Sequence, residues 1–273
     1  MILITGANGH LGQLTIHALL KENPQAKIAG LVRTAEKGKD LPVEIRLGDY
    51  NDKAALQTAL KGIEVLLLIS TGTFGNRVEQ HANVIDAAKA AGVQHIIYTS
   101  HVQAEGSPGP LAPDHAATEK LLIASGIAYT IFRNTFYMEY MPWFLGNAIE
   151  TGTWVYPSNG ARINLVLRSE IAEGLAKVLA APEKHRNKIY EITSSPSFTL
   201  AEMADILDIK YQDVTIEEFK EILAKAGLPQ EQIVVSAGIG VTFSSGALSY
   251  AGDDLEKLLG RKPVNIKSFL QQL

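Results

Sequence analysis

Short apolar runs alternate with helical patterns through the first half of the chain, and this alternation constrains the fold more than any other feature. Each run is short enough for a strand buried on both faces of a sheet. Between the runs, apolar residues recur at helical spacing, as at Leu11, Leu14 and Ala18. Repeated strand–helix units predict an α/β fold with a doubly wound parallel sheet of the Rossmann type. The expected strands are residues 1–4, 27–32, 43–47, 64–69, 94–99 and 128–132.

After about residue 134 the pattern becomes mixed. We therefore divide the chain into a dinucleotide-type Rossmann domain over residues 1–150 and a smaller mixed α/β lobe over residues 151–273. The strand and helix patterns of residues 163–192 could return to the first domain. Residues 238–252 are small and polar, which predicts a loop. The other elements expected here are strands at 154–156, 163–167 and 188–192 and helices at 168–179, 199–207, 215–226, 253–259 and 265–273.

A glycine-rich segment, Thr5 to Gly12, joins the first expected strand to the first helix. Gly6 permits a tight turn, Gly9 lets the backbone approach a pyrophosphate, and Gly12 lets the helix pack close to the strand. The helix N-terminus offers free N–H groups to phosphates. This context predicts a dinucleotide site, and the alternative is a glycine-rich turn without a ligand. The predicted phosphate-binding residues are Gly6, Asn8, Gly9, His10, Leu11 and Gly12.

The residue after the second strand distinguishes the two nicotinamide dinucleotides. NAD sites carry an acidic residue there, roughly 20 positions after the glycines, to hold the ribose 2′-OH. This chain has Arg33 in that place, and a guanidinium can pair with a 2′-phosphate. The sequence therefore favours NADP (NADPH) as cofactor over NAD. The alternative is that Arg33 is a solvated surface side chain.

Polar residues also follow the next three strands, where a cofactor would lie in such a sheet. Asp49 follows the third strand, and it would either face the adenine or cap the next helix. Ser70 and Thr71 follow the fourth strand, and Thr99 and Ser100 follow the fifth. We expect the last pair to lie at the nicotinamide end.

These motifs together resemble the NmrA-like branch of the atypical short-chain dehydrogenases. Within it, the chain is most similar to type 2 NAD(P)H:quinone oxidoreductases and triphenylmethane dye reductases. The resemblance implies an NADPH-dependent reductase whose partner is a small quinone-like substrate, bound in a cleft between two lobes. It also places Arg133, Asn134 and Tyr137 near the nicotinamide and substrate. The matching segments are residues 5–12, 31–33, 48–50, 80–83, 98–100, 114–115, 118–119 and 133–134.

The chain departs from the wider superfamily at its Tyr-x-x-x-Lys pair, where it has Leu111 and His115. A ketone needs an acid as hydride arrives, but a reduced quinone is phenol-like, with a pKa of about 10 by analogy with tyrosine. The absence of the Tyr–Lys pair is therefore compatible with quinone reduction, in which the protein acts mainly by positioning the two rings. His115 could orient the ribose or assist protonation, or it could be a polar helix-start residue without a chemical role. We take His115, Asn134 and Tyr137 as the catalytic candidates.

Two further features have both a structural and a functional interpretation. His81 is more readily explained as structural than as a ligand. An aromatic cluster could line a pocket for a flat ring, although such clusters more often form plain core. Its members are Phe136, Tyr137, Tyr140, Trp143 and Phe144.

Composition and the absence of certain motifs argue against several other classes of protein. The formal net charge is −4 and no Lys/Arg run is present, which argues against a nucleic-acid partner. The chain has no cysteine and no HExxH motif, so no metal site is expected, and it lacks the P-loop and the GxSxG elbow. No apolar stretch is long enough for a targeting or membrane segment, so we expect a cytoplasmic protein, and a homodimer is left open. The rival hypothesis is a redox sensor that binds NAD(P) without turnover.

Overall fold

Seven parallel strands form one sheet in the order β10-β6-β5-β4-β1-β2-β3. The computed structural model describes residues 1–72 and 75–273. The strand order reverses between β1 and β4, which is the point where doubly wound sheets bind ligands. The strands are β1 (Ile2–Ile4), β2 (Ile28–Val32), β3 (Glu44–Leu47), β4 (Val65–Leu68), β5 (His95–His101), β6 (Ala128–Asn134) and β10 (Lys188–Ile192).

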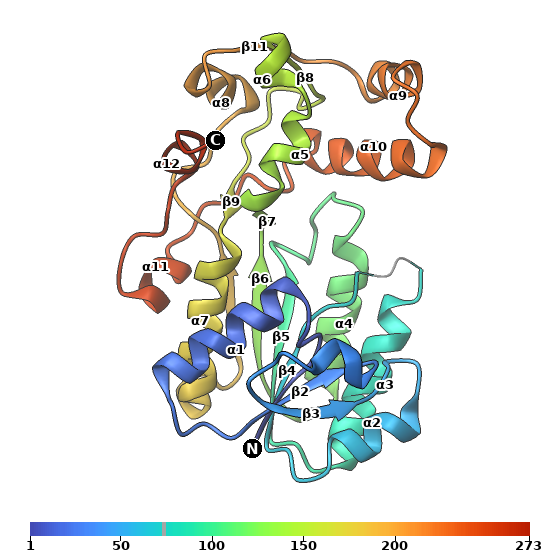
Figure 1. The fold of residues 1–273 in the computed structure, drawn as a ribbon, viewed down its shortest axis with the longest axis vertical. Coiled ribbons are helices and arrows are strands. Elements are labelled where there is room, and N and C mark those ends of the chain that lie inside the picture. The colour runs from blue at the N-terminus through green and yellow to red at the C-terminus, as the bar shows by residue number, and fades with distance from the viewer. Residues whose placement is uncertain (73–74) are drawn as a thin grey trace.

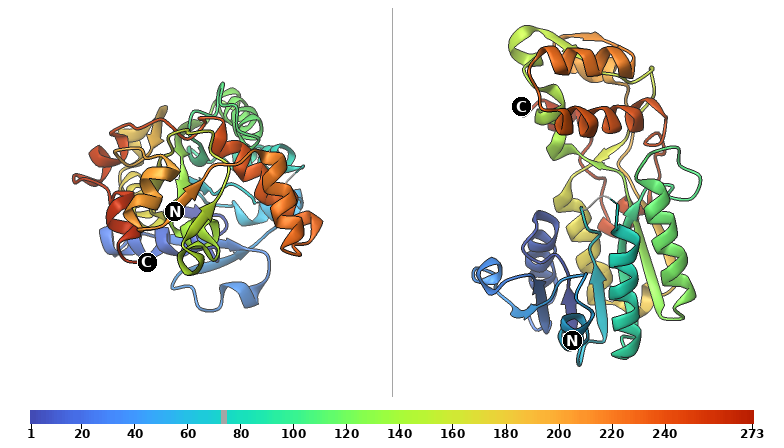
Figure 2. Two further views of the ribbon diagram at one scale, coloured as in Figure 1. Left: turned by 90° about the horizontal axis from the view of Figure 1, so that it is seen from above. Right: turned by 90° about the vertical axis from the view of Figure 1, so that its right-hand side faces the viewer.

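Helices cover both faces of this sheet (Figures 1 and 2). Because successive strand side chains point to opposite faces, Ile4 and Leu67 join the core under one helix pair, while Leu3 and Leu66 join the opposite core. One face carries α1 (His10–Glu22) and α7 (Arg168–Ala180), and the other carries α2 (Lys53–Ala59), α3 (Arg77–Ala90) and α4 (Ala112–Ala124). Short 3-10 turns occur at Ala35–Gly38 and Pro182–His185.

A smaller lobe lies beyond the carboxyl ends of the strands (Figures 1 and 2). It has its own core, in which Trp154, Met203 and Phe243 are almost fully buried. Its elements are β7 (Phe136–Tyr137), a 3-10 turn (Met138–Tyr140), α5 (Met141–Leu145), α6 (Ala148–Thr151), β8 (Thr153–Val155), β9 (Leu165–Val166), α8 (Leu200–Ile206), β11 (Lys210–Gln212), α9 (Ile216–Lys225), α10 (Gln230–Ser244) and α12 (Ile266–Leu270). Helix α11 (Asp254–Leu259) packs beside α7.

The predicted doubly wound sheet is confirmed, and all six strands expected in the first half are present. The chain then returns to the sheet, because α7 packs along α1 and β10 pairs with β6. The domain division at residue 150 therefore leaves one helix and one strand of the sheet layer in the second segment. We keep that division only as a prediction.

The loop expected over residues 238–252 is wrong for its first half, which belongs to helix α10. Ile233, Ala237 and Phe243 are buried at helical spacing, and this apolar face outweighs the low helix propensity of glycine. Close packing explains the glycine at position 240, since a Cβ at Gly240 would lie 2.7 Å from Cγ of Pro157. The small residue at position 240 thus marks close packing of α10 against Pro157.

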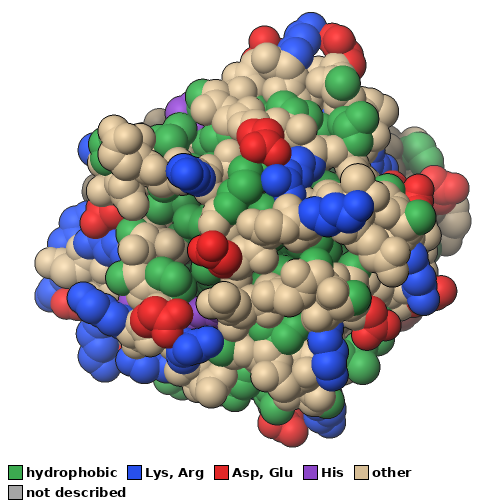
Figure 3. Space-filling model, turned by 90° about the horizontal axis from the view of Figure 1, so that it is seen from below, with side chains coloured by type: hydrophobic (Ala, Val, Ile, Leu, Met, Phe, Trp, Pro, Cys, Tyr) green, Lys and Arg blue, Asp and Glu red, His purple; other side chains and the backbone are tan. Residues whose placement is uncertain are grey.

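The surface opposite the small lobe mixes Lys and Arg with Asp and Glu (Figure 3). This face offers no single-sign field of the kind that nucleic acid requires. Within residues 1–72 and 75–273, no helix is long and apolar enough to cross a membrane. The same residues contain no cluster of His, Asp or Glu suited to a metal ion.

Candidate functional site

A groove of about 410 Å³ runs along the carboxyl ends of β1, β4, β5 and β6, below the small lobe. It brings together most of the residues that the sequence singles out, from the glycine turn to the aromatic segment after β6. This position is the crevice expected at the reversal of strand order. The predicted residues that line it are Gly6, Gly9, His10, Leu11, Gly12, Ser70, Thr71, Thr99, Ser100, His115, Asn134 and Tyr137.

The glycine turn has the geometry that the motif requires. Gly6 has a φ of +57°, and its carbonyl accepts a hydrogen bond of 2.9 Å from the Gly9 N–H. A Cβ at Gly12 would lie only 2.3 Å from the Gly6 carbonyl oxygen, so no side chain fits there. Gly9 is the N-cap residue of α1 and lacks a side chain to cap it, and the first turn of this helix contains no acidic residue. The helix therefore presents its amides and positive end to the groove.

A buried polar network fixes the turn to the neighbouring strand. The Thr5 hydroxyl donates to the Leu67 carbonyl (3.1 Å) and accepts from the Ile69 N–H (2.9 Å). The Tyr50 hydroxyl lies 2.5 Å from the Thr5 hydroxyl and 2.8 Å from the Ile69 carbonyl oxygen. Burial raises the pKa of Tyr50, so its hydroxyl stays protonated and able to donate. The ends of β1 and β4 are therefore held in a fixed relation.

Three predicted cofactor residues do not line the groove. Asn8 lies within the turn, where its carbonyl accepts a hydrogen bond of 2.8 Å from the Gln13 side chain. Arg33 is exposed after β2, and no residue of the described chain makes a hydrogen bond or an ion pair with its guanidinium. Its charge is free for an anion.

The carboxylate of Asp49 accepts hydrogen bonds from the main-chain and side-chain N–H groups of Asn51, at 2.8 and 2.9 Å. It does not cap α2, because Asp52 fills that position and accepts from the Ala55 N–H at 3.0 Å. The helix-cap interpretation of Asp49 is therefore wrong. Its position facing the adenine stays a prediction.

His81 has a structural role that positions the groove wall. The Thr118 hydroxyl donates to the Asp114 carbonyl (2.9 Å), so it accepts from His81 Nδ1, 3.0 Å away. This leaves His81 Nε2 to accept from the Thr71 N–H at 3.2 Å. Burial, assisted by the charge of Arg77, lowers the pKa of His81 to about 3. The neutral ring thus holds Thr71 at the groove.

His115 and His101 form the deep wall of the groove. The Tyr98 hydroxyl lies 2.8 Å from His115 Nδ1, and burial, with Arg77 nearby, holds the pKa of His115 well below its usual value. His101 Nδ1 donates to the Val102 carbonyl (2.8 Å), and burial lowers its pKa too. This leaves His101 Nε2 without a partner among the described residues. Both imidazoles are therefore neutral at physiological pH, and His115 belongs to the groove wall, not to a solvated helix end.

Asn134 is the most unusual polar group in the groove. Its side chain is 4% exposed, and neither its amide oxygen nor its amide nitrogen has a hydrogen-bond partner among the residues that the structure describes. An unsatisfied buried amide costs about 1–3 kcal/mol, so such a group needs a functional explanation. Its position at the end of β6 points to a ligand that fills the groove.

Two tyrosines and an arginine close the groove on the side of the small lobe. The rings of Tyr137 and Tyr140 stack with centroids 6.1 Å apart and an interplanar angle of 12°. The Arg168 guanidinium lies 4.7 and 4.4 Å from the two ring centroids. Desolvation raises the pKa of Tyr137 to about 12, although the charge of Arg168 opposes the shift. Tyr137 is therefore a neutral hydroxyl at physiological pH.

Arg133 does not line the groove, in contrast to what the resemblance implies. Its guanidinium makes a bidentate ion pair with Glu119, at 3.0 and 2.6 Å, and a third bond of 3.1 Å to Glu191. The Ser100 hydroxyl also donates to Glu119, at 2.5 Å. These bonds hold the Arg133 guanidinium between Glu119 and Glu191, away from the groove. Arg133 ties β6 to α4 and β10.

Sequence reasoning missed several groove residues, of which Arg168 is the most informative. It is the first residue of α7, a crossover helix that leads into β10. Such a helix begins at the carboxyl edge of the sheet, and this signal could have placed Arg168 beside the start of α1. The other groove residues missed are Ile69, Leu111 and Thr135.

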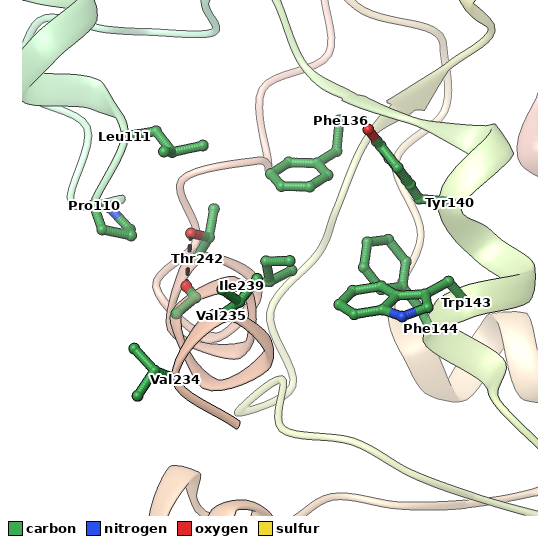
Figure 4. A pocket seen from close by; sticks show the side chains of 11 residues that line it. Pro110, Leu111, Phe136, Tyr140, Trp143, Phe144, Val234, Val235, Ile239 and Thr242 are labelled. Carbon is green, nitrogen blue, oxygen red and sulfur yellow. Dashed lines mark hydrogen bonds between the residues drawn. The ribbon is translucent and has the colours of Figure 1, made fainter. Parts of the chain in front are cut away.

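A second hollow, of about 920 Å³, adjoins the groove and lies between α5 and α10 (Figure 4). Leu111, Phe136 and Tyr140 line both cavities and form the wall that the two share. Trp143 and Phe144 stand on one side of the hollow, opposite side chains of α10 (Figure 4). The aromatic cluster therefore lines a cavity, and Phe144 is also part of the buried core.

The doubly wound sheet, with a glycine turn at its reversal of strand order and a groove beyond it, defines a dinucleotide-binding protein. The model of the NAD(P)H-binding family matches residues 6–182. Quinone oxidoreductase 2 of Escherichia coli is 37% identical over 100% of this chain and 98% of its own length. An NmrA-like family oxidoreductase of Aspergillus flavus is 28% identical, with coverages of 99% and 94%.

Solved structures agree with these matches. The E. coli NADPH-dependent quinone oxidoreductase in complex with NADPH superposes with a TM-score of 0.93 at 36% identity, covering 100% of this chain and 99% of the other. Triphenylmethane reductase of Citrobacter sp. in complex with NADP(H) gives a TM-score of 0.90 at 38% identity, with the same coverage. The chain belongs to the NAD(P)H-binding family, within its NmrA-like branch, and the resemblance stated from the motifs is confirmed.

Proposed function

We propose that this protein is an NADPH-dependent reductase that transfers a hydride directly to a quinone or a similar flat, electron-poor ring. The observation that carries the proposal is that a hollow with aromatic walls adjoins the groove and shares three lining residues with it. The E. coli relative is named as a quinone oxidoreductase, and its structure holds NADPH. This chain aligns with that relative over its whole length, which supports the same class of reaction.

The residues present fit NADPH. The free amides at the start of α1 suit the pyrophosphate, and the close approach of the turn excludes a side chain at Gly12. Arg33, which has no partner within the described residues, suits the 2′-phosphate. The unsatisfied Asn134 amide offers both a donor and an acceptor at the far end of the groove. When bound, NADPH would supply the hydride.

The side chains at this end of the groove position and polarise the acceptor ring and do not act as strong acids. Tyr137 keeps its proton, and His115 is neutral, so each is a weak donor at most. The Asn134 N–H can stabilise negative charge that develops on a quinone oxygen. A phenol-like product with a pKa of about 10 can take its proton from water. The chain therefore needs no Tyr–Lys pair for this substrate.

The proposal is tested by mixing the protein with NADPH and a panel of quinones while NADPH absorbance is followed. We expect turnover, and a primary isotope effect when the C4 hydrogen of NADPH that is transferred is replaced by deuterium. Tight binding of both oxidation states of the cofactor without turnover of any acceptor would instead identify a redox sensor.

Replacing Asn134 tests its role in the reaction separately from its effect on the stability of the protein. We expect Asn134→Leu to raise the free energy of unfolding by about 1 kcal/mol, because it removes two unsatisfied buried polar atoms. The same change should lower kcat for quinone reduction by about 10- to 100-fold, since a donor to the reacting oxygen is lost. Urea denaturation and steady-state kinetics measure the two effects.

Asn164 provides the matched control for this variant. It is also buried, but its carbonyl oxygen accepts from the Ser194 N–H at 2.8 Å and its amide donates to the Ser194 carbonyl. Asn164→Leu should therefore lose stability. Equal destabilisation of both variants would contradict a ligand-directed role for Asn134.

A further inference from the structure

The large hollow beside the groove is built almost entirely from apolar side chains. Val235 and Ile239 of α10 lie opposite Trp143 and Phe144 (Figure 4), and Val234 also lines the hollow. The Thr242 hydroxyl donates to the Gly238 carbonyl at 3.1 Å, so it offers little to a ligand. No charged side chain within the described residues lines this space. A charged group placed here would lose its hydration without compensation.

The hollow has the size of a substrate site and not of a packing defect. Its volume of about 920 Å³ lies near the upper end of the range of roughly 300–1,000 Å³ for small-molecule sites. A single-ring quinone placed against Phe136 and Tyr140 would leave most of this space empty. Several walls are exposed apolar side chains, with Trp143 at 52%, Val234 at 60% and Val235 at 44% exposure. An apolar group bound against these side chains would remove apolar surface from water, which is favourable.

The charge at the junction of the two cavities further restricts the ligand. Arg168 places its guanidinium over Tyr137 and Tyr140, and Tyr140 lines both the groove and the hollow. A cationic acceptor ring would meet this positive charge at the point where it must lie. A neutral ring would not, and its carbonyl oxygens would be attracted to the guanidinium.

Resting on the function proposed above, we propose that the preferred substrate is a neutral quinone with an apolar substituent of several carbons. The ring lies at the junction formed by Leu111, Phe136 and Tyr140, and the substituent fills the hollow between α5 and α10. The reaction is a two-electron reduction in which the quinone gains a hydride from NADPH and a proton from water. The products are the substituted hydroquinone and NADP⁺.

The test is a series of benzoquinones with unbranched alkyl substituents of increasing length, assayed with NADPH. Each buried methylene should lower KM by about fourfold until the hollow is full, which corresponds to roughly 0.8 kcal/mol. kcat should change little, because the added contacts are equal in the ground and transition states. A quinone whose substituent has the same length but ends in a trimethylammonium or a carboxylate should have a KM at least tenfold higher than its alkyl counterpart.

Two variants of α10 test whether the hollow causes the dependence of KM on chain length. Val235→Asp places a charge in the wall of the hollow and should flatten the dependence of KM on chain length. Val241→Asp is the matched control, since Val241 is 39% exposed on the same helix but does not line the hollow. It should keep the wild-type dependence. Inhibition by the alkylated hydroquinones, measured against chain length, gives the same comparison without turnover of the variant.

The outcomes separate this inference from the function on which it rests. Turnover of every quinone with a KM independent of chain length in the wild-type protein would overturn the inference and leave the reductase proposal intact. Equal preference for neutral and cationic tails would do the same. Absence of turnover with all quinones, together with no binding of the hydroquinones, would overturn both.

Discussion

Gly12→Ala should weaken NADPH binding by at least about 100-fold. The new Cβ would lie 2.3 Å from the Gly6 carbonyl oxygen and 2.9 Å from the Ala7 Cα. Both are main-chain atoms, so the turn itself must move away from the start of α1. A displacement of this kind in a positioning element costs about 100-fold in binding or rate. Isothermal titration with NADPH measures the loss directly.

Gly174→Ala is the control for this variant. Gly174 lies inside α7, where an added Cβ would meet its nearest neighbours, side chains of Leu255 and Phe132, at 3.5 Å. Alanine is also favoured over glycine within a helix. This variant should bind NADPH like the wild type. If Gly12→Ala bound NADPH equally well, the glycine turn would not be the phosphate site.

Arg33→Asp should weaken NADPH binding by about 100-fold while NADH binding changes by less than about threefold. Loss of a charge-assisted contact of about 1.5–3 kcal/mol accounts for most of this difference, and repulsion by the new carboxylate adds to it. Arg33 is exposed and has no partner within the described residues, so its replacement should leave the fold unchanged. Titration with both nucleotides at one ionic strength gives the ratio.

Lys27→Asp makes the same change in charge just before β2, at the opposite end of that strand. Since it alters the net charge equally, it reports the long-range electrostatic effect alone. We expect a small and equal change for both nucleotides. Equal losses of NADPH and NADH affinity in Arg33→Asp would show that Arg33 does not contact the 2′-phosphate.

The sequence predicts the cofactor half of the site because that half depends on local patterns. A strand, a glycine turn and a helix identify Gly6 to Gly12, and the parallel topology then places Thr71, Thr99 and Asn134 at the same edge. Each of these residues lies near the carboxyl end of a strand that can be located from its apolar run. No knowledge of the small lobe is needed.

The substrate half could not be predicted in this way. Arg168 reaches the groove through the packing of α7 along α1, and the hollow depends on the position of α10 relative to α5. Gly238 and Gly240 make the second part of α10 look like a loop in the sequence, although Gly240 packs closely against Pro157 in the structure. The direction of Arg133 depends on Glu119 and Glu191, which lie on other elements.

The groove takes its walls from two separately built cores. Gly6 and Thr99 lie at the carboxyl ends of β1 and β5, whereas Phe136 packs on the core of the small lobe. A nucleotide that touches both will favour the state in which both are folded, by mass action. Saturation with cofactor should therefore make the two lobes melt as one cooperative unit.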